Sequence, residues 1–174
     1  CARSTNCELQ KLCYEYGVDS NAFEGFKPTY ELDYSAPHLV RDNNKCILCR
    51  RCVAVCEEQY VSVIGANNRG IHTCIAQAFN LELNATTCIS CGQCTVVCPT
   101  GALVERDDTD KVWAALADNT KHVVVQTAPS IRATLGECFD MPIGTNVEGK
   151  MVAALRRLGF ERVFDTNTAA DFTI

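Results

Sequence analysis

The chain of 174 residues is long enough for one or two small domains, and its 47% hydrophobic content is ordinary for a globular protein. Its net charge of −5 and its lack of a basic stripe argue against a nucleic-acid partner. No segment approaches the run of about 18 apolar residues that a membrane-spanning helix needs, so no membrane span is predicted.

Thirteen cysteines are far more than a globular protein ordinarily has. A secreted disulfide scaffold would explain them, but the number is odd and they cluster at spacings of two and three residues, which favours metal ligation. Thiols kept reduced for metal imply a reducing compartment, and we predict a cytoplasmic location. The chain begins at Cys1 without an initiator Met, so we expect the natural N-terminus to lie upstream.

The first predicted element is a helix within "CARSTNCELQKLCYEYG" (1–17). Its apolar positions recur at helical spacing: Leu9, Leu12, Cys13 and Tyr16. Gly17 is placed to end the helix, and Cys13 falls on the apolar face, which predicts a core residue rather than a ligand. Cys1 and Cys7 stay open as ligands, because Cys7 lies at the helix start, where amide N–H groups stabilise a thiolate. Residues 18–40 are predicted to form an extended connection.

Two segments then repeat one cysteine spacing: "CILCRRCVAVCEE" (46–58) and "CISCGQCTVVCPT" (88–100). Both contain Cys-x2-Cys-x2-Cys-x3-Cys, the spacing in which three cysteines bind one 4Fe–4S cube and the fourth binds another. The reason is geometric, because a short loop can curl around only three corners of a cube before its direction carries it away. We expect the fourth cysteine to begin the following helix and to face the sister cube.

This spacing predicts two 4Fe–4S clusters that exchange one ligand each. The first is predicted to bind Cys46, Cys49, Cys52 and Cys98, and the second Cys88, Cys91, Cys94 and Cys56. Such sharing brings the clusters close together, which suits electron transfer. Zinc is the alternative, but a zinc ribbon uses two Cys-x2-Cys pairs, whereas each run here has a third cysteine interposed. Pro99 follows the second run, whereas Glu57 follows the first, which leaves one turn less constrained.

Between the runs, "QYVSVIGA" (59–66) and "GIHTCIAQAF" (70–79) predict two strands joined by a turn rich in Asn and Gly. The result is a bacterial-type two-cluster ferredoxin domain over residues 41–106 with an inserted hairpin. Cys74, within the second strand, is predicted to be a small buried hydrophobic residue rather than a ninth ligand. The three histidines stand alone and are predicted to lie at the surface or at strand ends: His38, His72 and His122.

After a linker predicted over 107–121, "HVVVQTAPS" (122–130) contains a continuous Val run, typical of a strand buried on both faces of a parallel sheet. Two helices follow, and "ERVFDT" (161–166) returns as a strand through a parallel crossover. Two strands alone leave apolar faces uncovered, so we expect a fragment of a larger polypeptide. The predicted class is α+β: a helical segment, the ferredoxin domain and an incomplete βαβ-like domain over 122–174.

The two helices between these strands each carry a predicted apolar stripe. The first stripe consists of Ile131, Leu135, Cys138 and Phe139, and the second of Val147, Met151, Ala154, Leu155 and Leu158. Asn146 is expected to cap the second helix and Gly159 to end it. The first stripe predicts that Cys138 is a core residue.

The whole chain resembles the large, catalytic subunit of iron-only (FeFe) hydrogenases. "CARSTNCELQ" resembles the second half of a His-x3-Cys-x2-Cys-x5-Cys motif, which these enzymes share with some NAD-linked formate dehydrogenases and with respiratory complex I. "QTAPSIRATLGE", "GKMVAALRRLGF" and "RVFDTNTAADFTI" are similar to the opening of the hydrogenase catalytic domain. The order of modules also fits: the end of the domain whose 4Fe–4S cluster has one His and three Cys ligands (1–40), the two-cluster domain (41–106) and the start of the H-cluster domain (122–174).

The resemblance implies further cofactors. Cys1 and Cys7 would be two of the four ligands of a third 4Fe–4S cluster. Ala128, Pro129 and Ser130 would lie against the H-cluster, although an ordinary strand-to-helix turn is the alternative. No residue here matches the family's H-cluster cysteines, its proton-relay Cys or its cyanide-binding Lys. We therefore expect no catalytic residue in this chain, and no activity from the fragment alone.

The leading hypothesis is the electron-relay part of an iron-only hydrogenase from an anaerobe, an oxidoreductase that interconverts protons and electrons with hydrogen. Its partners would be the rest of the polypeptide and an electron donor or acceptor such as ferredoxin or an NAD(P)H-linked flavoprotein subunit. A non-enzymatic iron–sulfur carrier subunit is an alternative, but it leaves residues 122–174 without a purpose. A formate dehydrogenase relay is another, but that family continues into a further Cys-rich motif, and here only Cys138 follows.

Overall fold

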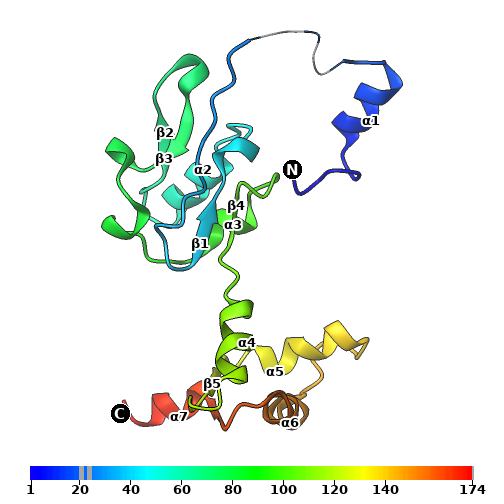
Figure 1. Cartoon of the computed structure of the whole chain (residues 1–174), viewed down its shortest axis with the longest axis vertical. Helices are drawn as coiled ribbons and strands as arrows, with labels where there is room; N and C mark the ends of the chain where they lie inside the picture. The colour runs from blue at the N-terminus through cyan, green and yellow to red at the C-terminus, as the bar shows by residue number, and fades with distance from the viewer. Residues whose placement is uncertain (20–21, 23–24, 174) are drawn as a thin grey trace. The chain divides into compact units, whose positions relative to one another are not determined.

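The computed structural model describes residues 1–19, 22 and 25–173, and the chain divides into two compact units, 1–106 and 107–174 (Figure 1). The first unit contains both cysteine runs, and the second contains the segment predicted to be βαβ-like. Both units combine helices and strands, so the predicted α+β class is confirmed. Within the described ranges, no helix is long and apolar enough to cross a membrane.

The first unit is built from short elements. In chain order they are α1 (Glu8–Glu15), β1 (Leu39–Arg41), η1 (Asn43–Lys45), α2 (Arg51–Glu58), β2 (Gly65–Asn67), η2 (Gly70–His72), β3 (Cys74–Ala76), η3 (Ala78–Asn80), η4 (Leu83–Ala85), α3 (Gln93–Val96) and β4 (Leu103–Glu105). Strands β1 and β4 pair antiparallel, with Leu39 opposite Glu105 and Arg41 opposite Leu103. This pairing joins the two ends of the segment that carries both cysteine runs.

The predicted hairpin is present but short. Strands β2 and β3 are antiparallel, with Gly65 opposite Ala76 and Asn67 opposite Cys74. Upstream, Tyr60 and Ser62 have φ values of 57° and 51°, which are incompatible with a continuous strand. Cys74 is 7% exposed, as predicted for a small buried hydrophobic residue.

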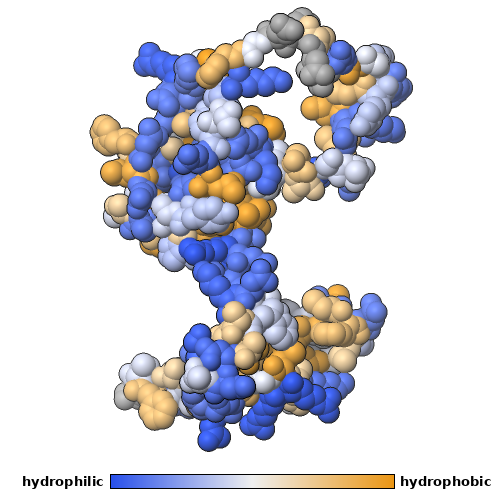
Figure 2. Space-filling model, in the orientation of Figure 1, coloured by the Kyte–Doolittle hydropathy of each residue, from blue (hydrophilic) through white to orange (hydrophobic). Residues whose placement is uncertain are grey.

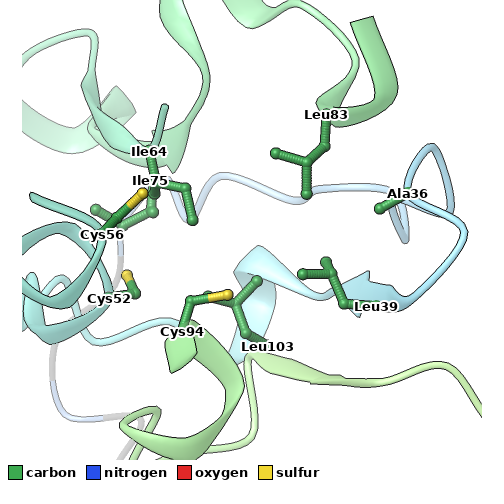
Figure 3. Close-up of a cluster of buried hydrophobic side chains, with 9 residues drawn as sticks. All are labelled: Ala36, Leu39, Cys52, Cys56, Ile64, Ile75, Leu83, Cys94 and Leu103. Carbon is green, nitrogen blue, oxygen red and sulfur yellow. The ribbon is translucent and has the colours of Figure 1, made fainter. Parts of the chain in front are cut away.

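The core of the first unit consists of nine buried side chains, drawn together in Figure 3: Ala36, Leu39, Cys52, Cys56, Ile64, Ile75, Leu83, Cys94 and Leu103. Three of them are cysteines of the two runs. The apolar core and the predicted metal sites therefore share side chains. A metal group bound in the sites would also affect the packing of the core.

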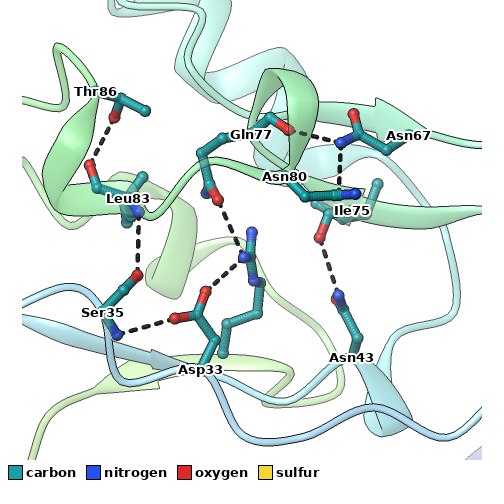
Figure 4. A network of polar contacts seen from close by, with 10 residues as sticks. Asp33, Ser35, Asn43, Asn67, Ile75, Gln77, Asn80, Leu83 and Thr86 are labelled. Carbon is teal, nitrogen blue, oxygen red and sulfur yellow. Dashed lines mark hydrogen bonds and ion pairs between the residues drawn. The ribbon is translucent and has the colours of Figure 1, made fainter.

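A buried polar network ties the hairpin to β1 (Figure 4). The Arg41 guanidinium forms an ion pair with Asp33 and donates a hydrogen bond to Gln77 Oε1 at 3.0 Å. Gln77 is 1% exposed, so its side chain depends on protein partners. Asn43 Nδ2 adds a hydrogen bond to the Ile75 carbonyl at 3.1 Å.

Helix α1 forms where the pattern predicted it, and Gly17 follows it with φ of 61°. Its apolar face is not part of a core, however, since Leu9 is 70% exposed and Tyr16 is 75% exposed. Cys13 is half-buried rather than a core residue, and none of the residues of this helix is buried. In the predicted connection 18–40, Asp33 bridges to Arg41, while residues 20–21 and 23–24 lie outside the described part.

The second unit is a small α/β arrangement. It consists of α4 (Thr109–Ala117), β5 (Val124–Thr127), α5 (Ile131–Thr134), η5 (Leu135–Phe139), α6 (Glu148–Leu158), β6 (Arg162–Asp165) and α7 (Thr166–Asp171). Strands β5 and β6 are parallel, with Val124 opposite Arg162 and Thr127 opposite Asp165, so the predicted crossover is confirmed. Helix α4 occupies much of the range 107–121 that was predicted to be a linker.

Strand β5 is not buried on both faces as predicted. Its side chains alternate between exposed and half-buried, and Val124 is 48% exposed; within the described part of the chain, β5 pairs with β6 alone. Figure 2 shows hydrophobic side chains, in orange, at the surface of this unit. Just before α6, Asn146 Oδ1 accepts a hydrogen bond from the Glu148 N–H at 3.0 Å, and Gly159 ends the helix with φ of 110°, as predicted.

Of the two apolar stripes predicted between the strands, the second is partly correct and the first is wrong, since Ile131 and Phe139 are 42% and 67% exposed. Val147, directly before α6, and Met151 within it are buried, but Ala154 and Leu158 are exposed. Cys138 was predicted to be a core residue and is exposed. The α-helix α5 ends after four residues and continues as the 3₁₀-helix η5, which has about three residues per turn rather than 3.6, so the α-helical spacing that predicted the stripe does not hold from Leu135 onward.

Candidate iron–sulfur sites

The two cysteine runs fold in the same way. In the first loop Leu48 and Arg50 have φ of 57° and 61°, and in the second loop Ser90 and Gly92 have φ of 56° and 74°. In both runs the second left-handed residue caps a helix, and the third cysteine lies within that helix. The repeated sequence therefore produces a repeated backbone.

The position of the fourth cysteine corrects one expectation. It does not begin the following helix. Cys56 lies in the last turn of α2, and Cys98 lies just beyond the end of α3. The helices start earlier than predicted, because the left-handed residues Arg50 and Gly92 turn the chain into a helix directly before the third cysteine.

The first cavity is formed by the first run together with the last cysteine of the second run. Its cysteines are Cys46, Cys49, Cys52 and Cys98. Two arginines, Arg41 and Arg50, also line it, together with Asn43, Ile75 and Thr100. This is the cysteine set that the spacing assigned to one cluster.

The second cavity is formed by the second run together with the last cysteine of the first run. Its cysteines are Cys56, Cys88, Cys91 and Cys94. The remaining wall is mainly aliphatic, with Val61, Val63, Ile64 and Leu83, and His38 completes it. All thirteen cysteines are free thiols, so no disulfide competes for these side chains.

The donor sets fit iron–sulfur clusters. Each cavity offers four cysteine sulfurs, the soft ligands that hold a 4Fe–4S cube. Within the described chain, no three His, Cys, Asp or Glu side chains are grouped so as to hold a single metal ion. Ligation by the eight cysteines stays a prediction, now with a geometry in which each set surrounds one cavity.

Burial sets the proton affinity of the two equivalent third cysteines. Desolvation, aided by the neighbouring cysteines of the same site, raises the pKa of Cys52 and of Cys94 to about 11. Desolvation also raises the pKa of Cys46. Without iron, the fold thus holds these thiols in the neutral form, and binding of cationic iron would displace their protons.

Cys98 has the opposite tendency. Burial works to raise its pKa, but hydrogen bonds from the backbone amides of Leu103, Thr100 and Ala102 outweigh this and lower the pKa. The Thr100 hydroxyl also lies 3.8 Å from Cys98 Sγ. The turn after α3 therefore stabilises a thiolate at the cysteine that crosses from the second run to the first cavity.

His38 is a site residue that sequence reasoning missed. It lies at a strand end, directly before β1, as predicted, but it is not isolated: its Nε2 lies 3.9 Å from Cys88 Sγ and its Nδ1 lies 3.1 Å from Ser90 Oγ. The partners are about fifty positions away in the sequence, and only the fold brings them together. The other two histidines lie outside both cavity walls: His72 contacts the Phe26 ring, and His122 Nδ1 lies 2.5 Å from Glu161 Oε2.

The two N-terminal cysteines lie apart from these cavity walls. Cys1 is exposed, and Cys7 is half-buried at the start of α1. Neither is among the residues that line the two cavities. The Ala2 N–H donates to the Thr100 carbonyl at 2.9 Å, which fixes the start of the chain beside the turn after Cys98. A third cluster at Cys1 and Cys7 stays a prediction.

In the second unit, Ala128, Pro129 and Ser130 form an exposed turn at the carboxyl end of β5, an edge where α/β sheets commonly bind ligands. Arg132, which sequence reasoning also missed, holds this turn. Its Nε donates to the Pro129 carbonyl at 2.9 Å, and its Nη1 lies 3.0 Å from Asp165 Oδ2.

Paired cavities, each with four cysteines drawn from two runs, are the arrangement expected of a dicluster iron–sulfur domain. In agreement, residues 45–102 match the family described as 4Fe-4S dicluster domain. Residues 121–174 match the family described as iron only hydrogenase large subunit, C-terminal domain. These two family matches confirm the predicted resemblance to iron-only hydrogenases and the predicted 4Fe–4S cofactors.

The whole chain aligns with two hydrogenase sequences. It is 49% identical over 176 residues to the NADP-reducing hydrogenase subunit HndD of Solidesulfovibrio fructosivorans, covering 100% of this chain and 30% of the relative. It is 40% identical over 181 residues to iron hydrogenase 1 of Clostridium pasteurianum, covering 100% of this chain and 31% of the relative. The chain thus spans less than a third of these relatives.

Other similarities are partial. A protein described as a formate dehydrogenase from Staphylococcus haemolyticus is 33% identical over 101 residues, which cover 58% of this chain and 10% of that protein. Among solved structures, an NAD+-reducing NiFe-hydrogenase in the H2-reduced state matches with a TM-score of 0.51 and 31% identity, covering 62% of this chain and 47% of that one. The similarity to formate dehydrogenase leaves much of the chain unmatched.

Proposed function

We propose that this chain is the electron-relay part of an iron-only hydrogenase and holds two 4Fe–4S clusters. The first would be held by Cys46, Cys49, Cys52 and Cys98, and the second by Cys88, Cys91, Cys94 and Cys56. The observation that carries the proposal is that each cavity is lined by three cysteines of one run and one of the other. A bound cluster supplies one-electron storage, and adjacent sites allow an electron to pass between them.

The chain itself contributes binding and shielding. Its two loops each curl around three sulfurs, and the crossing cysteines connect the sites. Cys52, Cys56 and Cys94 are at most 9% exposed, so water is largely kept from those sulfurs. Cys49 and Cys91 are exposed and leave one corner of each site accessible from outside.

For the whole protein we propose reversible conversion of protons and electrons to hydrogen at an H-cluster. The match of residues 121–174 to the hydrogenase C-terminal domain supports this, as does the turn of Ala128, Pro129 and Ser130 at a sheet edge suited to ligands. The same match disfavours a stand-alone electron carrier and a formate dehydrogenase, because neither would need this segment. We propose that residues 1–40 are the end of the domain whose cluster has one His and three Cys ligands, and that residues 41–106 are the ferredoxin domain. Residues 107–121 would be a linker, and residues 122–174 the start of the catalytic domain.

The proposed partners are the rest of the polypeptide and further subunits, since one relative is named as a subunit of an NADP-reducing hydrogenase. The electron donor or acceptor would be ferredoxin or an NAD(P)H-linked flavoprotein subunit. Cys1 and Cys7 would contribute to a third cluster. We propose a cytoplasmic location, which suits thiols that must stay reduced.

The test is anaerobic reconstitution of the 174-residue chain, followed by iron and sulfide analysis and low-temperature EPR. We expect two 4Fe–4S clusters whose signals interact magnetically on full reduction. Cys98→Ser and Cys56→Ser should each disturb one cluster, whereas the control Cys74→Ser, at a buried cysteine outside both cavity walls, should leave both intact. Zinc in place of iron, or two intact clusters in Cys98→Ser, would contradict the proposal.

A further inference from the structure

His38 is held in place by the backbone on both sides of it. Leu39, directly after it, and Ala36, two residues before it, are 3% and 2% exposed and belong to the core. The His38 carbonyl accepts a hydrogen bond from the Arg106 N–H at 3.1 Å, which extends the pairing of β1 with β4. The imidazole, which lines the second cavity, therefore extends from a fixed point of the fold.

The contacts of the two ring nitrogens favour one tautomer. A neutral imidazole has one N–H donor and one acceptor nitrogen. The Ser90 hydroxyl, 3.1 Å from Nδ1, can donate to it and so leaves the ring proton on Nε2. Nε2 then faces Cys88 Sγ at 3.9 Å, where a thiolate sulfur can only accept. With Cys88 as a thiolate, the geometry fits a short chain in which Ser90 donates to His38 and His38 donates to Cys88.

We propose that His38 is a positioning residue that raises the reduction potential of the second cluster by donating Nε2–H to Cys88. The inference rests on the proposed function, since it needs a cluster in that cavity. Reduction adds one electron to the site, no bond forms or breaks, and His38 keeps its proton throughout. The added electron increases negative charge on the ligand sulfurs, so an N–H donor stabilises the reduced form more than the oxidised form.

The repeated loops provide an internal comparison. Ser90 corresponds to Leu48 in the first loop, and their φ values of 56° and 57° show the same backbone. Leucine has no hydroxyl to orient a ring, and none of the described residues that line the first cavity is a histidine. The hydrogen-bond chain is thus confined to one of two otherwise similar sites. The second cluster is easier to reduce with this chain than it would be without it.

The test is an EPR-monitored redox titration of the reconstituted 174-residue chain with dithionite and mediators. In His38→Ala, the midpoint potential of the second cluster should shift to a more negative value, and the reduced-to-oxidised ratio at a fixed potential should fall by about threefold, the effect of one weak hydrogen bond. The first cluster should be unaffected.

His38→Gln, which restores an N–H donor, should recover part of the shift. The EPR signal of the second cluster is identified separately, as the signal whose shape changes in Cys91→Ser.

Two further variants keep the outcome decisive. Ser90→Ala should give a smaller shift in the same direction, and it serves as the test if His38→Ala fails to retain its clusters. His72→Ala replaces an exposed histidine outside the second cavity wall and should leave both potentials unchanged. Unchanged potentials in His38→Ala or Ser90→Ala, with both cluster signals present, would overturn the inference while the proposed function stands. Absence of clusters from the wild-type chain would overturn the proposed function and this inference with it.

Discussion

Cys52 and Cys94 occupy equivalent places in the two runs and face the same physical conflict. Each lies in the first turn of a helix and in the buried core, at 8% and 9% exposure, yet each is predicted to bind iron as a thiolate. Desolvation disfavours that charge and raises the pKa of both thiols to about 11. The metal-free fold thus favours neutral thiols, and the same residues become ionised only with a cationic partner.

This conflict predicts how the stability of the metal-free chain depends on pH. The pKa of each thiol rises from 9.0 to about 11 in the folded state. Between these values the unfolded chain has lost the proton and the folded chain retains it, so the free energy of unfolding should fall as pH rises from about 9 to 11. Each thiol can contribute up to about 3 kcal/mol to this fall, and nothing below pH 9.

Urea unfolding of the metal-free chain under anaerobic, reducing conditions at pH 8, 9, 10 and 11 would measure the effect. The control is the Cys52→Ser, Cys94→Ser double variant, whose hydroxyls do not titrate in this range. The double variant should lose most of the decline that the wild-type chain shows. An equal decline in both would mean that other groups, such as tyrosines and lysines, cause it.

At the scale of elements, Arg41 links β1, the preceding connection and the hairpin through Asp33 and Gln77. Arg41→Leu should destabilise the first unit by about 3 kcal/mol, because it leaves the buried Gln77 amide and the Asp33 carboxylate without their partner. The matched control is Arg69→Leu at an exposed position on the hairpin, where a change below about 0.5 kcal/mol is expected. Chemical denaturation of the cluster-containing chain checks both, and similar effects of the two variants would count against the network.

The cluster loops allow a second test at this scale. Gly92 has φ of 74° and nothing within 4 Å of an added Cβ, so Gly92→Ala should destabilise the first unit by about 1 kcal/mol through backbone strain alone. Gly149→Ala, in helix α6 with equally open space and no positive φ, should stabilise the second unit by about 0.5 kcal/mol or more. In thermal unfolding, we expect Gly92→Ala to lower the stability of its unit and Gly149→Ala to raise the stability of its unit. Changes of the same sign would show that φ is not the cause.

The same elements show what sequence could predict. Cysteine spacing predicted which four sulfurs share a cavity, because ligand number and loop length leave few alternatives. It did not predict where the helices start, which the left-handed Arg50 and Gly92 decide. His38 could not be found from local pattern, since its partners come from a loop about fifty positions away. Cys138 was misplaced because periodicity cannot distinguish an α-helix from one that tightens into a 3₁₀-helix after four residues.

At the scale of the whole molecule, the two units depend on different interactions. In the first unit, three of nine core side chains are proposed ligands, and the strands that surround the sites have only three residues each. The second unit contains one cysteine, Cys138, which is exposed, and its buried residues Val147 and Met151 are aliphatic and thioether side chains. Because binding free energy of a metal site is also folding free energy, the clusters should stabilise one unit and not the other.

Removal of iron and sulfide should therefore raise amide hydrogen exchange across residues 45–105 and leave exchange across 122–165 unchanged. In the cluster-containing chain we expect slow exchange in α2 and α3, and at least a tenfold increase once the clusters are removed, since about 1.4 kcal/mol of lost stability corresponds to that factor. Hydrogen-exchange mass spectrometry of both forms, under anaerobic conditions, makes the comparison within one chain. Equal loosening of both units would contradict this division, because it would mean that the clusters support the packing of the whole chain rather than that of the first unit alone.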